Sequence, residues 1–301
     1  MRRRYSFVRF NLLTAALALS IAVQVFAQRP SEPAVELVRR TVQNEIKANN
    51  NNVAFSFQER RESPAGSQVE LMVETREAMA GMLIANNDHP LNAEQRQAEI
   101  AHLDHLVQDP AELARKKTKE AETKDRITRI VKALPDAFLY EFDGTDTGNP
   151  LMGGQAARLT RLKFTPNPKY DPPSHVEQIL TGMQGTMLID AKQERVARID
   201  GVLAREVGFG WGILGHLNPG GHLMVDQADV GGGNWEVTRL GLDLTGKLFF
   251  IKPLVYKSTK TYSAFHPAPP NLSFAEGVEL LKKHEAFLAT NQEANQAQKG
   301  R

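Results

Sequence analysis

The chain contains no cysteine among its 301 residues. This absence excludes disulfide bonds, thiolate metal sites, cysteine nucleophiles and a lipid anchor on a processed N-terminal cysteine. Folding must therefore rest on packing alone, and the composition allows it. Hydrophobic residues make up 41% and charged residues 24% of the sequence, which is ordinary for a globular protein that buries a core.

Catalytic motifs are also missing. The sequence has neither the GxSxG nor the SxxK pattern of activated serines. No Gly-Lys-Ser/Thr follows its glycine-rich stretches, which excludes a P-loop for phosphate binding. We therefore expect the protein not to be an enzyme, and we expect it to use no cofactor.

Long hydrophobic runs are confined to the N-terminus. Four arginines precede an uncharged apolar run over 12–23, and Val25-Phe26-Ala27 fits the small-x-small pattern of a cleavage site. The run is shorter than the ~20 residues of a spanning helix. These features predict a signal peptide over 1–27, cleaved after Ala27. The mature protein is then periplasmic or secreted, with no integral membrane segment.

The leader also changes the charge balance. Without its four arginines, the 37 basic residues become 33 against 35 acidic ones, so the formal charge goes from +2 to −2. A slightly acidic chain gives no support for nucleic-acid binding.

Hydrophobic spacing predicts a helix, then a series of short strands, then a closing helix. The first helix spans 31–48 and the last spans 271–288, followed by a polar tail over 291–301 that we expect to be disordered. Glycine-rich residues 231–234 predict a hairpin turn. The expected strands span 53–62, 69–75, 79–84, 138–142, 159–164, 185–190, 195–203, 221–230, 235–244, 248–251 and 254–262.

Residues 92–134 interrupt the strands with a predicted pair of helices. Asp109-Pro110 reads as an N-cap followed by proline in the first turn, which separates the two helices. Strands grouped apart from helices indicate an α+β fold. We expect one domain over 28–290 that carries 92–134 as a helical insertion.

The chain resembles the LolA/LolB-like superfamily of lipoprotein-sorting proteins and their periplasmic relatives. The resemblance rests on the leader, the amphipathic first helix, the two late hairpins, and the segments 185–190, 198–200 and 232–235. It implies an open, incomplete antiparallel β-barrel or curved sheet covered by helices. It also implies a lipid or a lipoprotein acyl chain as the ligand, and a carrier role.

The candidate ligand-binding residues lie around a glycine-rich apolar insert over 208–221. Glycine allows sharp bends while the apolar side chains need burial, so the insert is either a lid on an apolar cavity or part of the core. The candidates are Phe209, Trp211, Ile213, Leu214, Leu217 and Trp235.

Metal ligation and acid catalysis have only weak signals. His102 and His105 stand three residues apart on a helix with Asp104 between them, but a zinc site needs a third ligand, so we expect no metal. Acids on several strands are most simply solvated. An alternative function is a scaffold or envelope-stress sensor that binds protein partners through the helices of 92–134.

Overall fold

Residues 33–301 cluster as one compact unit and residues 1–32 as a separate one. The predicted signal peptide lies outside the described part of the chain. Among the described residues, no helix is long and apolar enough to cross a membrane. The computed structural model describes residues 32–48, 53–209, 215–248 and 252–299.

The helices agree closely with the sequence expectation. Asn92 and Asp109 are the N-caps of the helical pair, and proline follows Asp109 in the first turn as predicted. The described helices are α1 (Ala34–Ala48), α2 (Ala93–Gln108), α3 (Pro110–Ala137), the short 3-10 helix η1 (Glu177–Gly182) and α4 (Phe274–Lys299).

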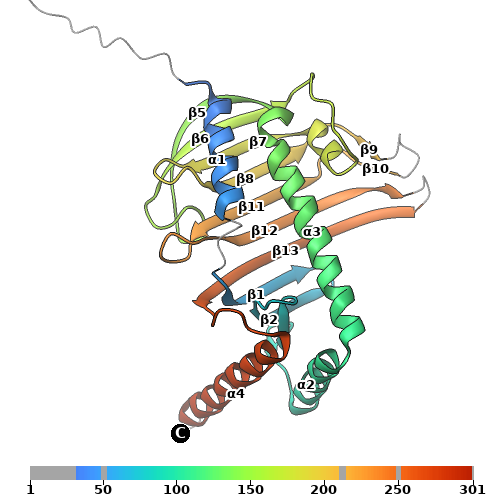
Figure 1. Cartoon of the computed structure of the whole chain (residues 1–301), viewed down its shortest axis with the longest axis vertical. Coiled ribbons are helices and arrows are strands. Elements are labelled where there is room, and N and C mark those ends of the chain that lie inside the picture. Colours follow the sequence, from blue (N-terminus) through green and yellow to red (C-terminus); the bar gives the residue numbers. More distant parts are fainter. Residues whose placement is uncertain (1–31, 49–52, 210–214, 249–251, 300–301) are drawn as a thin grey trace, which may run out of the picture. The chain divides into compact units, whose positions relative to one another are not determined.

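The strands in the described part of the chain form one 13-stranded sheet (Figure 1). They are β1 (Phe55–Ser63), β2 (Gly66–Val73), β3 (Ala80–Asn86), β4 (His89–Pro90), β5 (Phe138–Thr147), β6 (Arg158–Pro166), β7 (Met183–Asp190), β8 (Val196–Leu203), β9 (Val207–Phe209), β10 (Gly215–Leu217), β11 (His222–Asp229), β12 (Trp235–Leu248) and β13 (Lys252–Pro267).

The sheet is antiparallel and open. Its order is β4-β3-β2-β1-β13-β12-β11-β8-β7-β6-β5, with β10 pairing β12 and β9 off this path. The edges β4 and β5 are not paired with each other, so the sheet does not close into a barrel. This confirms the predicted α+β fold with an open curved sheet.

The helical pair is more than an insertion. It connects β4, at one edge of the sheet, to β5, at the opposite edge. With 28 residues, α3 reaches roughly 42 Å at ~1.5 Å per residue. Figure 1 shows it lying across one face of the sheet, from β5 towards β2.

Three cores are described, and the third is formed by Met152, Leu159, Leu188, Ala197 and Trp235. The other two occupy opposite faces of the sheet. On the face that we call inner, α1 and the C-terminal part of α3 pack on β5–β8. On the outer face, α2 and α4 pack on β2 and β3. The strand register shows that the faces are opposite. Leu240, Lys260 and Arg61 are paired neighbours on β12, β13 and β1, so their side chains share the inner face. Leu71 of the outer core pairs with Gln58, which is three residues from Arg61 on β1 and therefore points to the other face.

Several ends differ from the sequence expectation; β12 extends to Leu248 beyond the predicted end at 244, and β13 extends to Pro267 beyond the predicted end at 262. The strand predicted to stop at Phe142 continues as β5 to Thr147, beyond a bulge in its pairing with β6. Helix α3 continues through Pro135 to Ala137. Helix α4 continues to Lys299, past the start of the tail that we expected to be disordered.

Candidate ligand cavity beneath helix α3

The inner face of β11 and β12 carries apolar side chains that are only half-buried. Val225 pairs with Leu240, and Leu223 pairs with Leu242. Leu223 also packs against the inner core, but Val225, Leu240 and Leu242 belong to none of the three described cores. An apolar strip along β12 is therefore incompletely covered.

Hydrophobic side chains of α3 pack into a core at both ends of the helix but not in between. Leu113 packs against the outer core, and Ile130, Val131 and Leu134 pack against the inner core. No side chain from Ala114 to Ile127 belongs to a described core. This middle stretch contributes no core packing where α3 crosses the sheet.

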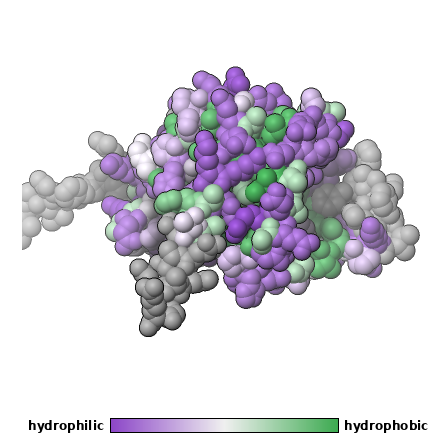
Figure 2. Space-filling view, turned by 90° about the horizontal axis from the view of Figure 1, so that it is seen from below, coloured by the Kyte–Doolittle hydropathy of each residue, from purple (hydrophilic) through white to green (hydrophobic). Residues whose placement is uncertain are grey.

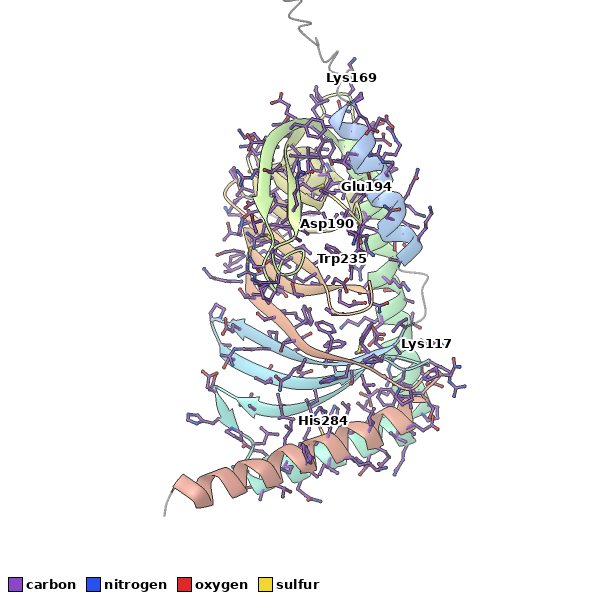
Figure 3. The ribbon with its side chains drawn as sticks, turned by 90° about the vertical axis from the view of Figure 1, so that its left-hand side faces the viewer. Lys117, Lys169, Asp190, Glu194, Trp235 and His284 are labelled. Carbon is purple, nitrogen blue, oxygen red and sulfur yellow. The ribbon has the colours of Figure 1, made fainter. Side chains whose placement is uncertain are left out.

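A cavity of 670 Å³ opens at one end of this crossing. It lies among the middle of α3, the β2–β3 connection and the start of β12. In Figure 3, Trp235 lies between β12 and the helices, and Lys117 lies on the lower part of α3. The lining residues used below are Glu74, Lys117, Glu120, Ala121, Lys124, Trp235 and Glu236.

Two carboxylates in this cavity are electrostatically perturbed. Burial, assisted by the negative charge of Glu74, raises the pKa of Glu236 to about 7. Burial also raises the pKa of Glu74, against the opposing effects of its hydrogen bond from the Phe55 amide and of the Lys124 charge. A carboxyl group with a pKa near neutrality sits poised between its two protonation states.

Close to Glu236, several side chains are held by buried contacts. Arg195 donates two hydrogen bonds of 2.9 Å to Glu45 of α1, and both side chains are buried. The Arg195 guanidinium lies 5.7 Å from the centre of the Trp235 ring. The Trp235 indole also donates to Gln193 at 2.9 Å. These contacts fix α1 and the start of β12 relative to each other.

The predicted ligand-binding residues do not all lie in one place. Trp235 lines the cavity, although most of its side chain is buried. Leu217 is buried in the inner core. Phe209 ends β9, but its side chain lies outside the described part of the structure, as do Trp211, Ile213 and Leu214. The choice between lid and core therefore stays open for the insert.

His102, His105 and Asp104 do not form a metal-binding group in the described structure. Asp104 instead pairs with Lys282 at 2.5 Å. The ligand atoms of His105, Asp109 and Glu112 lie within 4.8 Å of one another. However, Asp109 already accepts two backbone hydrogen bonds as the cap of α3, which accounts for its position.

The strand acids each have a structural partner. The pairs and caps are Asp190 with the Lys192 and Gln193 amides, Asp200 with His222, Asp226 with Arg198 and Arg239, Asp229 with the Gly231 and Gly233 amides, and Asp243 with Lys257.

The cavity residues were missed because they come from segments far apart in the sequence. Glu74, Lys124 and Glu236 carry no local signal that they meet. The apolar strip did have a signal, since Leu240, Leu242 and Leu244 alternate along the strand. What the sequence could not show is that α3 crosses this strip.

Comparison with known proteins adds little. No family model and no curated protein matches the chain. A crystal structure of a DUF1329 family protein from Desulfovibrio piger is similar over 83% of this chain and 100% of that one, with 8% sequence identity and a TM-score of 0.29. Similarity at this level supports no functional argument.

Proposed function

We propose that the protein binds an acyl chain of a lipid or of an acylated protein beneath α3, on the inner face of the sheet. The observation that carries the proposal is the half-buried strip of Val225, Leu240 and Leu242, which lies outside every described core. The cavity lined by Trp235 and Glu236 lies at the start of β12, the strand that carries Leu240 and Leu242.

The energetics suit a single chain. Each methylene removed from water contributes ~0.8 kcal/mol, so about ten of them contribute roughly 8 kcal/mol before the cost of association. We expect affinities in the range of about 1–100 µM for a single long-chain fatty acid. Such affinities suit a carrier, which has to release its ligand.

Titration of a fluorescent fatty acid tests the proposal. Leu242→Glu places a charge on the inner face, so we expect the affinity for the probe to fall at least tenfold. Val255 pairs with Thr245 on the outer face and is 72% exposed. Val255→Glu is the matched control and should leave the affinity within twofold. Equal affinities for both variants and the unaltered protein would contradict an inner-face site.

The alternative of protein docking through the helical pair has less support. Leu103 and Leu106 of α2 are already buried in the outer core. Figure 2 shows the α2 and α4 end of the described surface as mostly hydrophilic, with small separate hydrophobic patches. The pair also links the two sheet edges, so its deletion would disrupt the fold and could not test docking.

A further inference from the structure

Glu236 differs from the other carboxylates of the cavity. Among the described residues, its side chain makes no hydrogen bond and no ion pair. The other three carboxylates each accept a hydrogen bond from a backbone amide. These bonds are Glu74 from Phe55 at 3.2 Å, Glu77 from Phe274 at 2.8 Å and Glu120 from Met79 at 3.0 Å. A half-buried carboxylate without a partner is unfavourable unless a ligand supplies one.

Two lysines of the same cavity are also without partners in the described structure. Lys117 and Lys124 line it from α3, and neither ammonium makes an ion pair or a hydrogen bond to a described residue. They are seven residues apart, which places them on one face of the helix about 10 Å from each other.

The unpaired charges of the cavity come from two different elements, and Glu74 interacts with both. The charge of Lys124 acts on Glu74, and the charge of Glu74 acts on Glu236. The two unpaired lysines belong to α3, and the unpaired carboxylate belongs to β12. Beyond Glu236, β12 bulges at Thr238 in its pairing with β11. Leu240 and Leu242 follow the bulge, four and six residues from Glu236, or roughly 13–20 Å at ~3.3 Å per residue.

We infer that the cavity binds a zwitterionic lipid head group, with its primary ammonium at Glu236 and its phosphate at Lys117 and Lys124. The inference rests on the proposed function, because the acyl chain of the same lipid would follow β12 beneath α3. A primary ammonium has three donors for carboxylate oxygens, whereas a quaternary ammonium has none. An ethanolamine phosphate therefore fits better than a choline or a glycerol phosphate.

The electrostatics give this binding a pH dependence. An ammonium beside Glu236 favours the ionised carboxyl, whose pKa burial has raised to about 7. Binding then releases a proton, so the affinity rises as the pH passes from 6 to 8. The other charged groups of the surrounding elements are Glu45, Glu74, Arg76, Glu77, Lys117, Glu120, Lys124 and Arg195.

The test is displacement of the fluorescent fatty acid by lysophospholipids that share one acyl chain, used below their micelle concentrations. We expect the ethanolamine lipid to bind at least fivefold more tightly than the choline and glycerol lipids. Glu236→Gln should weaken the ethanolamine lipid about tenfold and remove its preference over the choline and glycerol lipids. Free phosphoethanolamine should displace the probe only at concentrations at least a hundredfold higher, because it lacks the chain.

The lysines are tested by a second variant and a control. Lys117→Ala combined with Lys124→Ala should weaken all three phospholipids about fivefold. Lys119→Ala, on the opposite side of α3, should change nothing. If the unaltered protein binds the probe, equal affinities for the three lipids would overturn the inference. Free phosphoethanolamine binding as tightly as the lipid would also overturn it. Failure of the unaltered protein to bind the probe would instead contradict the proposed function.

Discussion

At the scale of single residues, charged side chains in this protein divide into those with partners and those without. The buried pair of Glu45 and Arg195 satisfies both members, and the Val196 amide also donates to Glu45 at 2.9 Å. Glu236 lies near this pair, yet it has no partner among the described residues. None of this is visible in the sequence, because the partners are about 150 residues apart.

The buried pair should be costly to break. Glu45→Gln leaves the Arg195 charge buried and without a counter-charge, so we expect it to lower the free energy of unfolding by about 3 kcal/mol. Glu62→Gln, which removes an exposed partner of Arg60, should change it by about 0.5 kcal/mol or less. Urea denaturation of both variants measures the difference. A similar small effect for both would show that the buried pair contributes no more than a surface pair.

Glu236 should make stability depend on pH. Its pKa is raised from 4.5 to about 7 in the folded protein, so the folded state keeps a proton that the unfolded chain has lost. Stability is therefore greatest below about pH 4.5 with respect to this group and falls as the pH rises to about 7.

Glu236→Gln removes the titrating carboxyl and therefore the loss of stability with rising pH. Relative to the unaltered protein, we expect the variant to gain about 1 kcal/mol at pH 8, allowing for partial solvation, and nothing at pH 4.5. Urea denaturation at the two pH values provides the measurement. An unchanged difference between the variant and the unaltered protein across this range would show that Glu236 does not titrate there.

At the scale of elements, local signals gave the helices and hairpins and missed some ends. Caps and turns such as Asp109 and 231–234 are local, and their predictions are confirmed. The end of α3 depends on distant groups instead. Asn167 donates to the carbonyls of Asp136 and Ala137, and the Tyr140 hydroxyl donates to that of Leu134. These bonds satisfy the last turn and let the helix run through Pro135.

The middle of α3 should report a ligand beneath it. Because the chain has no cysteine, one introduced thiol can carry an environment-sensitive fluorophore. At Ala121→Cys, on the cavity side, we expect palmitate to shift the emission by about 10 nm or more. At Lys119→Cys, two residues earlier and on the other side, the shift should be absent. A shift at both positions would indicate a general rearrangement, and none at either would argue against a site beneath α3.

At the scale of the whole molecule, the open sheet was predictable and its order was not. Alternating strands and separate helices indicated the α+β fold, but pairing of β1 with β13 joins segments about 200 residues apart. The crossing of α3 from one sheet edge to the other follows from this order. The candidate cavity exists because of that crossing, so sequence patterns alone could not place it.

The most direct test of the acyl-chain proposal is photo-crosslinking with a diazirine analogue of palmitate, followed by peptide mapping. We predict labels on β12 at 240–244 and on α3 at 114–127, both lost in the presence of excess palmitate. Labels confined to the outer face, or labels that excess palmitate does not displace, would contradict it.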